Sequence, residues 1–62
     1  MKQIYEFEFR NTDGSWEGGL SEPFFDRNSA EKAALTFSDV FKEDVRFKAD
    51  HQTEYQYVKY TP

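Results

Sequence analysis

Glu6 and Glu8 are the two residues whose type and spacing come nearest to a known chemistry. They alternate with aromatic residues in the stretch YEFEF, and positions two apart on an extended strand are separated by about 7 Å. Glycosidases hold their paired carboxyl groups at comparable separations. Every strand with acids at alternate positions has this spacing, however, and a chain this short offers no deep substrate pocket. We therefore expect this protein not to be an enzyme.

Other reactive groups are sparse. His51 is the only histidine; without cysteine it would need a carboxylate or serine partner, which the turn expected around it does not position. The segment DRNSAE begins like a calcium-binding loop but has Glu31 where such a loop requires glycine. Only three glycines are present, and no phosphate-binding loop can be built from them. The sequence predicts no metal and no cofactor.

A first hairpin should position the acidic pair. Residues 3–10 alternate with a period of two, which places Tyr5, Phe7 and Phe9 on one face of a strand. The other face then carries a mixed set of residues: Ile4, Glu6, Glu8 and Arg10.

The pair Asp13-Gly14 predicts a tight turn after this strand. A two-residue loop would place Arg10 opposite Glu17, whereas a four-residue loop would oppose Glu8 to Glu17, a pair of like charges. We favour the tighter loop. Both registers place the same residues of the second strand on the aromatic face: Trp16, Gly18 and Leu20.

The second strand is interrupted by the pair Gly18-Gly19. Glycines inside a strand indicate a bulge or a place where a neighbouring ring covers bare backbone, here Phe7 or Phe9. Pro23 cannot donate to a ladder, so this strand should lie at an edge of the sheet or end there.

The segment NSAEKAALTFSDVFK predicts the one helix. Asn28 is a suitable N-cap, and Glu31 would complete an approximate capping box. Leu35 falls on the outer side of this helix, as an isolated exposed residue or a partner contact. The apolar stripe that would face the sheet recurs at helical spacing: Ala30, Ala33, Ala34, Phe37, Val40 and Phe41.

Two further strands, in DVRFKAD and TEYQYVKY, should form a second hairpin connected by residues 50–52. The chain is thus expected to be one α+β domain over residues 1–62, with the order β-β-α-β-β. Its four-stranded antiparallel sheet should have the strand order 2-1-3-4, with the helix on one face. The expected core is Phe7, Phe9, Trp16, Leu20, Ala33, Phe37, Phe41, Phe47 and Tyr57. The expected water-facing surface is Ile4, Glu6, Glu8, Arg10, Arg46, Lys48, Gln56, Val58 and Tyr60.

The charge of this chain is unevenly distributed. Residues 1–31 carry seven acids and three bases, which accounts for the whole net charge of −4, whereas residues 32–62 are balanced. A surface that follows a phosphate backbone needs clustered Lys and Arg, so direct nucleic-acid binding is not expected. No segment is apolar enough for a membrane span, and Glu6 and Glu8 interrupt any signal peptide. The absence of cysteine fits a reducing cytoplasm.

In size, acidity, lack of cysteine and hairpin–helix–hairpin outline, the chain resembles small phage-encoded proteins that inhibit host machinery or bacterial defence, such as anti-CRISPR proteins. This resemblance rests on no motif. It implies a protein-binding inhibitor in the host cytoplasm that occludes a basic, nucleic-acid-handling surface of a larger protein. We expect the partner surface to comprise Glu6, Glu8, Arg10, Asp13, Glu17 and Tyr60. The alternatives are acids that serve only solubility, a module that dimerises through an edge strand, and a nucleic-acid or small-ligand binder.

Overall fold

The computed structural model describes residues 1–62 and confirms the predicted α+β architecture. Four antiparallel strands form one sheet in the order β2-β1-β3-β4. Their bounds, with that of the single helix, are β1 Gln3–Arg10, β2 Trp16–Phe24, α1 Arg27–Phe41, β3 Val45–Ala49 and β4 Gln56–Val58. The helix is neither long nor apolar enough to cross a membrane.

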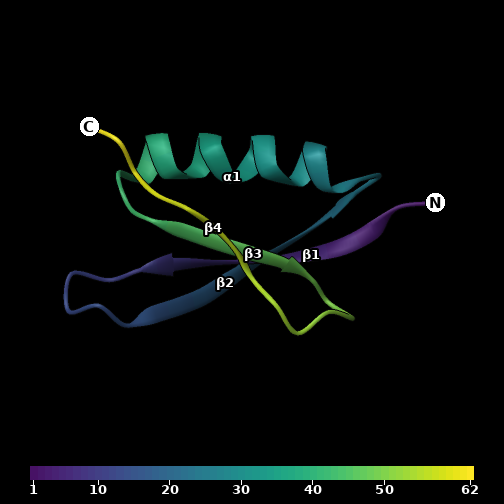
Figure 1. Ribbon diagram of the computed structural model, residues 1–62, viewed down its shortest axis with the longest axis horizontal. Helices are drawn as coiled ribbons and strands as arrows, with labels where there is room; N and C mark the ends of the chain where they lie inside the picture. The colour runs from purple at the N-terminus through teal and green to yellow at the C-terminus, as the bar shows by residue number, and fades with distance from the viewer.

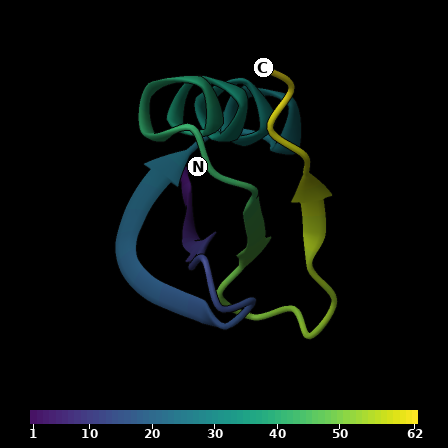
Figure 2. The ribbon, with the colours of Figure 1, turned by 90° about the vertical axis from the view of Figure 1, so that its left-hand side faces the viewer.

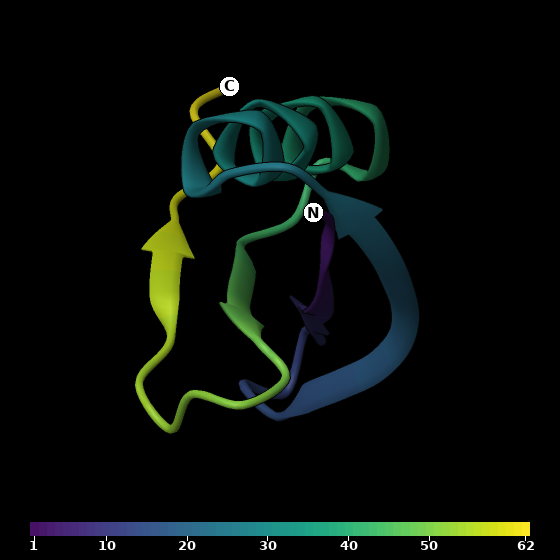
Figure 3. The ribbon, with the colours of Figure 1, turned by 90° about the vertical axis from the view of Figure 1, so that its right-hand side faces the viewer.

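The molecule has two layers. Helix α1 runs along one face of the sheet and packs chiefly against β3 (Figure 1). The view along the long axis shows β2 and β4 on the two flanks, with β1 and β3 between them (Figure 2). From the opposite end β2 is seen to sweep outward in a strong curve (Figure 3). No second helix covers the face of the sheet that points away from α1, which we call the open face.

The core lies between α1 and the central strands. Phe7 and Phe47 are each 1% exposed and their rings stack with centroids 5.7 Å apart. Phe37 of α1 meets Phe7 edge to face at 5.2 Å, a geometry that aromatic pairs favour. The other buried apolar residues are Tyr5, Ala30, Ala34, Val45, Ala49 and Val58, with Phe9, Leu20, Phe24, Ala33 and Phe37 partly buried around them.

The first hairpin differs from the predicted tight turn. Asn11 N–H donates to the carbonyl of Ser15 at 2.7 Å, so the loop spans residues 11–15. Gly14 has φ +91°, a conformation that glycine adopts without a steric penalty. Arg10 pairs with Trp16, not with Glu17. Neither predicted loop length was correct.

A bulge at the glycine pair explains why the predicted faces of β2 were half wrong. Phe7 lies opposite Leu20, but Glu8 lies opposite Gly18, so Gly19 is an extra residue in the ladder. Because of this extra residue, the residues of β2 before Gly19 point to the opposite faces from those that regular alternation predicts. Leu20 therefore stays over the core, whereas Trp16 lies on the open face beside Arg10. The ring expected to cover Gly18 is absent, because its neighbour is the Glu8 side chain.

The predicted alternation of β4 was also wrong. Val58 lies opposite Val45 and is only 8% exposed, whereas Tyr57 lies opposite Arg46 and is 62% exposed. Residues 50–55 form a longer connection than the predicted 50–52, and they leave a strand of three residues. Val58 thus belongs to the core and Tyr57 to the open face, the reverse of the prediction.

Helix α1 begins earlier than predicted. Asp26, not Asn28, is the N-cap, and its carboxylate accepts a hydrogen bond from the Ser29 amide at 2.8 Å. This hydrogen bond lowers the pKa of Asp26. At the other end Lys42 adopts a left-handed conformation. Val40 and Phe41, predicted to lie on the apolar stripe that faces the sheet, remain 64% and 54% exposed.

Candidate binding surface

The open face carries a row of side chains that crosses all four strands. The ladder places Gly18 of β2 beside Glu8 of β1, Glu8 beside Arg46 of β3, and Arg46 beside Tyr57 of β4. The curve of β2 brings Trp16 toward the same row. Residues far apart in the sequence, such as Glu8 and Arg46 at a separation of 38 positions, are therefore neighbours on this surface.

Arg46 is the centre of this row. Its Nε donates to Glu8 Oε1 at 2.6 Å, and its guanidinium carbon lies 4.1 Å from the Tyr55 ring centroid and 4.6 Å from that of Trp16. The cation is thus held between two aromatic faces and fixed by a carboxylate, an arrangement that restricts its rotamers. Burial opposes the charge of Arg46, but the hydrogen bond to Glu8 and the negative charge of Glu8 outweigh burial and raise the pKa of Arg46.

The surrounding rings are also fixed by contacts. Tyr55 donates its hydroxyl to Glu8 Oε2 at 3.3 Å, and burial, reinforced by the Glu8 charge, raises the pKa of that hydroxyl. Trp16 and Tyr57, which come from opposite edges of the sheet, meet edge to face with centroids 5.7 Å apart. We call Trp16, Arg46, Tyr55 and Tyr57, together with Glu8, the arginine cluster.

The predicted acids of strand one are mostly neutralised on this surface. Glu8 is the partner of Arg46, and Glu6 lies 3.6 Å from the ammonium of Lys48. Arg10 in turn lies 3.6 Å from Asp44. The open face therefore presents matched ion pairs, whereas the predicted partner surface carried four acids and one base.

Of the other predicted site residues, only Tyr60 lies near this set, because it borders the same hollow as Arg10. Asp13 lies in the exposed hairpin loop, where hydrogen bonds from the side chain and backbone of Ser15 lower its pKa. Glu17 lies opposite Phe9, which places it on the helix side of the sheet. Tyr60 follows β4, and its amide donates to Asp44 at 2.9 Å. The structure thus brings together Glu6, Glu8 and Arg10 and links Tyr60 to Arg10 through Asp44. It separates Asp13 and Glu17 from them.

Sequence reasoning missed most of the arginine cluster, because Trp16 and Tyr57 were assigned to the core. One signal was available. Glu8 and Arg46 carry opposite charges on the water-facing side of strands predicted to be neighbours, and such pairs favour a cross-strand contact.

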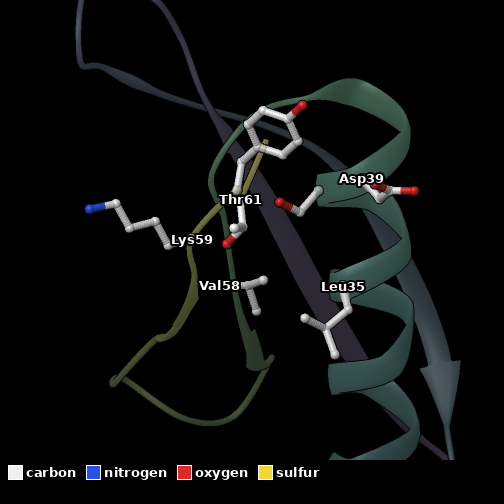
Figure 4. A pocket seen from close by; sticks show the side chains of 7 residues that line it. Leu35, Asp39, Val58, Lys59 and Thr61 are labelled. Carbon is white, nitrogen blue, oxygen red and sulfur yellow. The ribbon is translucent and has the colours of Figure 1, made fainter.

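Two hollows lie on the helix side. The smaller, of about 220 Å³, lies between α1 and the segment after β4 (Figure 4). Leu35 borders it and is 51% exposed, in agreement with the prediction that it faces away from the sheet. This volume is below the roughly 300 Å³ at which small-molecule sites begin. The larger, of about 490 Å³, lies between β2 and the end of α1.

The one histidine of the chain lies beside an acid. His51 is exposed in the turn after β3, and its Nδ1 lies 3.6 Å from the exposed carboxylate of Asp50. No group of three or more His, Asp or Glu side chains is positioned to hold a metal ion.

Comparisons with protein-family models, with curated proteins and with solved structures find no match.

Proposed function

We propose that this chain is a small protein-binding module and that it inhibits a larger protein by covering a basic, nucleic-acid-handling surface. The observation that carries the proposal is the arginine cluster on the open face. Trp, Tyr and Arg are the residue types that dominate the energetics of protein interfaces. In this chain they are gathered on one surface that no other element covers.

The side chains of the arginine cluster are both held in place and at least partly exposed, which supports a role in binding as well as in the stability of the sheet. Arg46, Trp16 and Tyr55 are already held by mutual contacts, so a partner would not bear the cost of ordering them. Tyr57 contacts Trp16 within the cluster and is still 62% exposed. Its exposed surface is free for a partner. The molecule measures 35 × 20 × 16 Å, and its broad face is comparable to the roughly 800 Å² that one partner contributes to a standard interface.

The net charge supports a basic partner. Ion pairs neutralise the open face locally, but the chain as a whole carries −4. A net charge of this sign accelerates association with a positively charged surface, and salt weakens this effect. In this proposal the aromatic residues hold the partner, while acids outside the ion pairs of the open face, including Asp13, attract it.

A capture experiment tests the proposal. The immobilised protein, its Tyr57→Ser variant and its Val40→Ser variant are exposed to cell lysate at low and high salt, and the captured proteins are quantified by mass spectrometry. Val40 is a matched control, because it is 64% exposed and lies on the helix. We expect a basic protein whose capture falls about tenfold or more in Tyr57→Ser, as for a hot-spot residue. Capture should persist in Val40→Ser and weaken with salt.

Equal capture by Tyr57→Ser and the parent would show that the open face is not the binding surface. Capture that does not depend on salt would reject the basic partner. Circular dichroism of both variants excludes unfolding as the cause of any loss.

A further inference from the structure

The larger hollow on the helix side is an apolar groove with an acidic rim. Its apolar lining is formed by Phe9, Leu20, Phe37 and Phe41. One wall is the backbone of Gly18-Gly19 in edge strand β2, where no side chain projects. We call this hollow, of about 490 Å³, the β2 groove.

Phe41 gives this groove an unusual exposed surface. Its ring contacts Phe9 edge to face at 5.2 Å, yet 54% of the residue remains exposed to water. The Phe41 ring is therefore held in place by Phe9 and still offers apolar surface against which a side chain of a partner could pack.

The charged residues that line the groove are all acids. Glu17 and Glu43 are its only ionisable lining residues, and neither takes part in an ion pair. The one side-chain hydrogen bond of Glu17 is accepted from Asn11 Nδ2 at 3.5 Å. This differs from the open face, where Glu6 and Glu8 each have a basic partner.

We propose that the β2 groove binds a short segment of a partner protein in which an apolar side chain is flanked by Lys or Arg. The apolar side chain would enter among Phe9, Phe37 and Phe41, and the cation would lie against Glu17 and Glu43. The bare backbone at Gly18-Gly19 allows the segment to approach the edge strand closely.

Charge decides against a second copy of this chain as the occupant. Another copy would bring a further net charge of −4 to a groove whose only lining charges are negative. A basic segment gains from the same field.

This inference extends the proposed function by adding a second contact for a basic partner, but it lies on the other face of β2. Trp16 pairs with Arg10 on the open face, whereas Glu17 and Leu20 pair with Phe9 and Phe7 above the core. The two surfaces can therefore be tested separately.

The test is an NMR titration of the ¹⁵N-labelled protein with a capped peptide of sequence Gly-Lys-Leu-Lys-Gly. Two matched peptides serve as controls, one with Ser in place of Leu and one with Glu in place of both Lys. We expect saturable shifts of the amides of residues 17–20 and 37–43, with a Kd on the order of millimolar for so small a ligand. Neither control peptide should reproduce them.

Matched variants separate the charges of the groove from the overall charge. The double variant Glu17→Gln/Glu43→Gln should weaken peptide binding about threefold to tenfold and flatten its salt dependence. The double variant Glu22→Gln/Glu31→Gln removes the same charge from β2 and α1 at positions outside the groove, and its Kd should change less than twofold. Phe41→Ser should weaken binding, and Val40→Ser should not.

Shifts elsewhere on the protein, or equal binding of the Glu peptide, would overturn the proposal. So would equal losses in the two double variants, since overall charge would then explain the effect. Tyr57→Ser should leave peptide binding unchanged, so a failure of the open-face proposal and a failure of the groove proposal give different results.

Discussion

The two faces of the sheet use the same aromatic residue types in opposite ways. Over the core, Phe7, Phe37 and Phe47 pack ring against ring and exclude water. On the open face, Trp16 and Tyr55 enclose the charged side chain of Arg46. The first arrangement gains from burial of apolar area. The second keeps its rings in place with a cation and a carboxylate, so that aromatic surface can remain next to water without collapsing into a second core.

The largest effect should come from the core face. Phe47→Ala removes a ring that is 1% exposed and stacked on Phe7, and such truncations cost about 3–5 kcal/mol. Because small domains have a free energy of unfolding of only about 5 kcal/mol, the variant should be largely unfolded or melt far below the parent. Urea denaturation followed by circular dichroism measures this. A parent-like midpoint would show that the stability does not depend on the core face.

An intermediate effect should come from the arginine cluster. In a double-mutant cycle of Glu8→Gln and Arg46→Gln, we expect a coupling free energy of about 1–2 kcal/mol, because both side chains are less than one quarter exposed. The cycle Glu6→Gln with Lys48→Gln is the control. Glu6 is 42% exposed and the pair is 3.6 Å apart, so its coupling should stay below about 0.5 kcal/mol. Equal couplings would remove the distinction between the cluster and an ordinary surface pair.

The smallest effect should come from the edge of the cluster. Tyr57→Ser removes the edge-to-face contact with Trp16, which is worth about 0.5–1.5 kcal/mol, and the exposure of Tyr57 places its loss at the lower end. Chemical denaturation should show a loss of about 0.5 kcal/mol. A loss as large as that of Phe47→Ala would mean that the open face is a second core, and the exposed tyrosine would no longer suggest a binding role.

The parts of the fold that regular periodicity determines were predicted correctly. The period-two alternation of β1 and β3, the helical spacing of Ala30 and Ala34, and the strand order all agree with the structure. Each depends on local pattern and on general rules of connection.

The errors fall where one residue changes the alternation. The glycine pair was recognised as a possible bulge, but no sequence rule says which side of a bulge keeps its face, so Trp16 was misplaced. In β4 the adjacent residues Tyr57 and Val58 could each face the core, and tyrosine can also face water through its hydroxyl. The sequence pattern therefore does not decide which of the two faces inward. The longer connection before β4 turned Val58 inward. The same two errors concealed the arginine cluster, since both of its edge rings had been assigned inward.

The N-cap shows a third kind of limit. Asp26 and Asn28 are both good caps, and the sequence pattern alone does not rank them. The structure selects Asp26, which accepts the Ser29 amide, because the chain leaves β2 at Phe24 and turns into the helix at once.

The bulge in β2 also has a consequence for how this chain should be aligned with others. Leu20 and Gly18 lie opposite Phe7 and Glu8, which are adjacent in β1, so Gly19 has no partner residue in the pairing of the two strands. A homologue lacking that single codon would form a regular strand with Trp16 still on the open face and Leu20 still on the core. Insertions and deletions are usually assigned to loops, but in this hairpin the gap belongs inside the strand. If an alignment placed this gap in the loop of residues 11–15 instead, the residues of β2 before Gly19 would be matched to residues on the opposite face of the sheet.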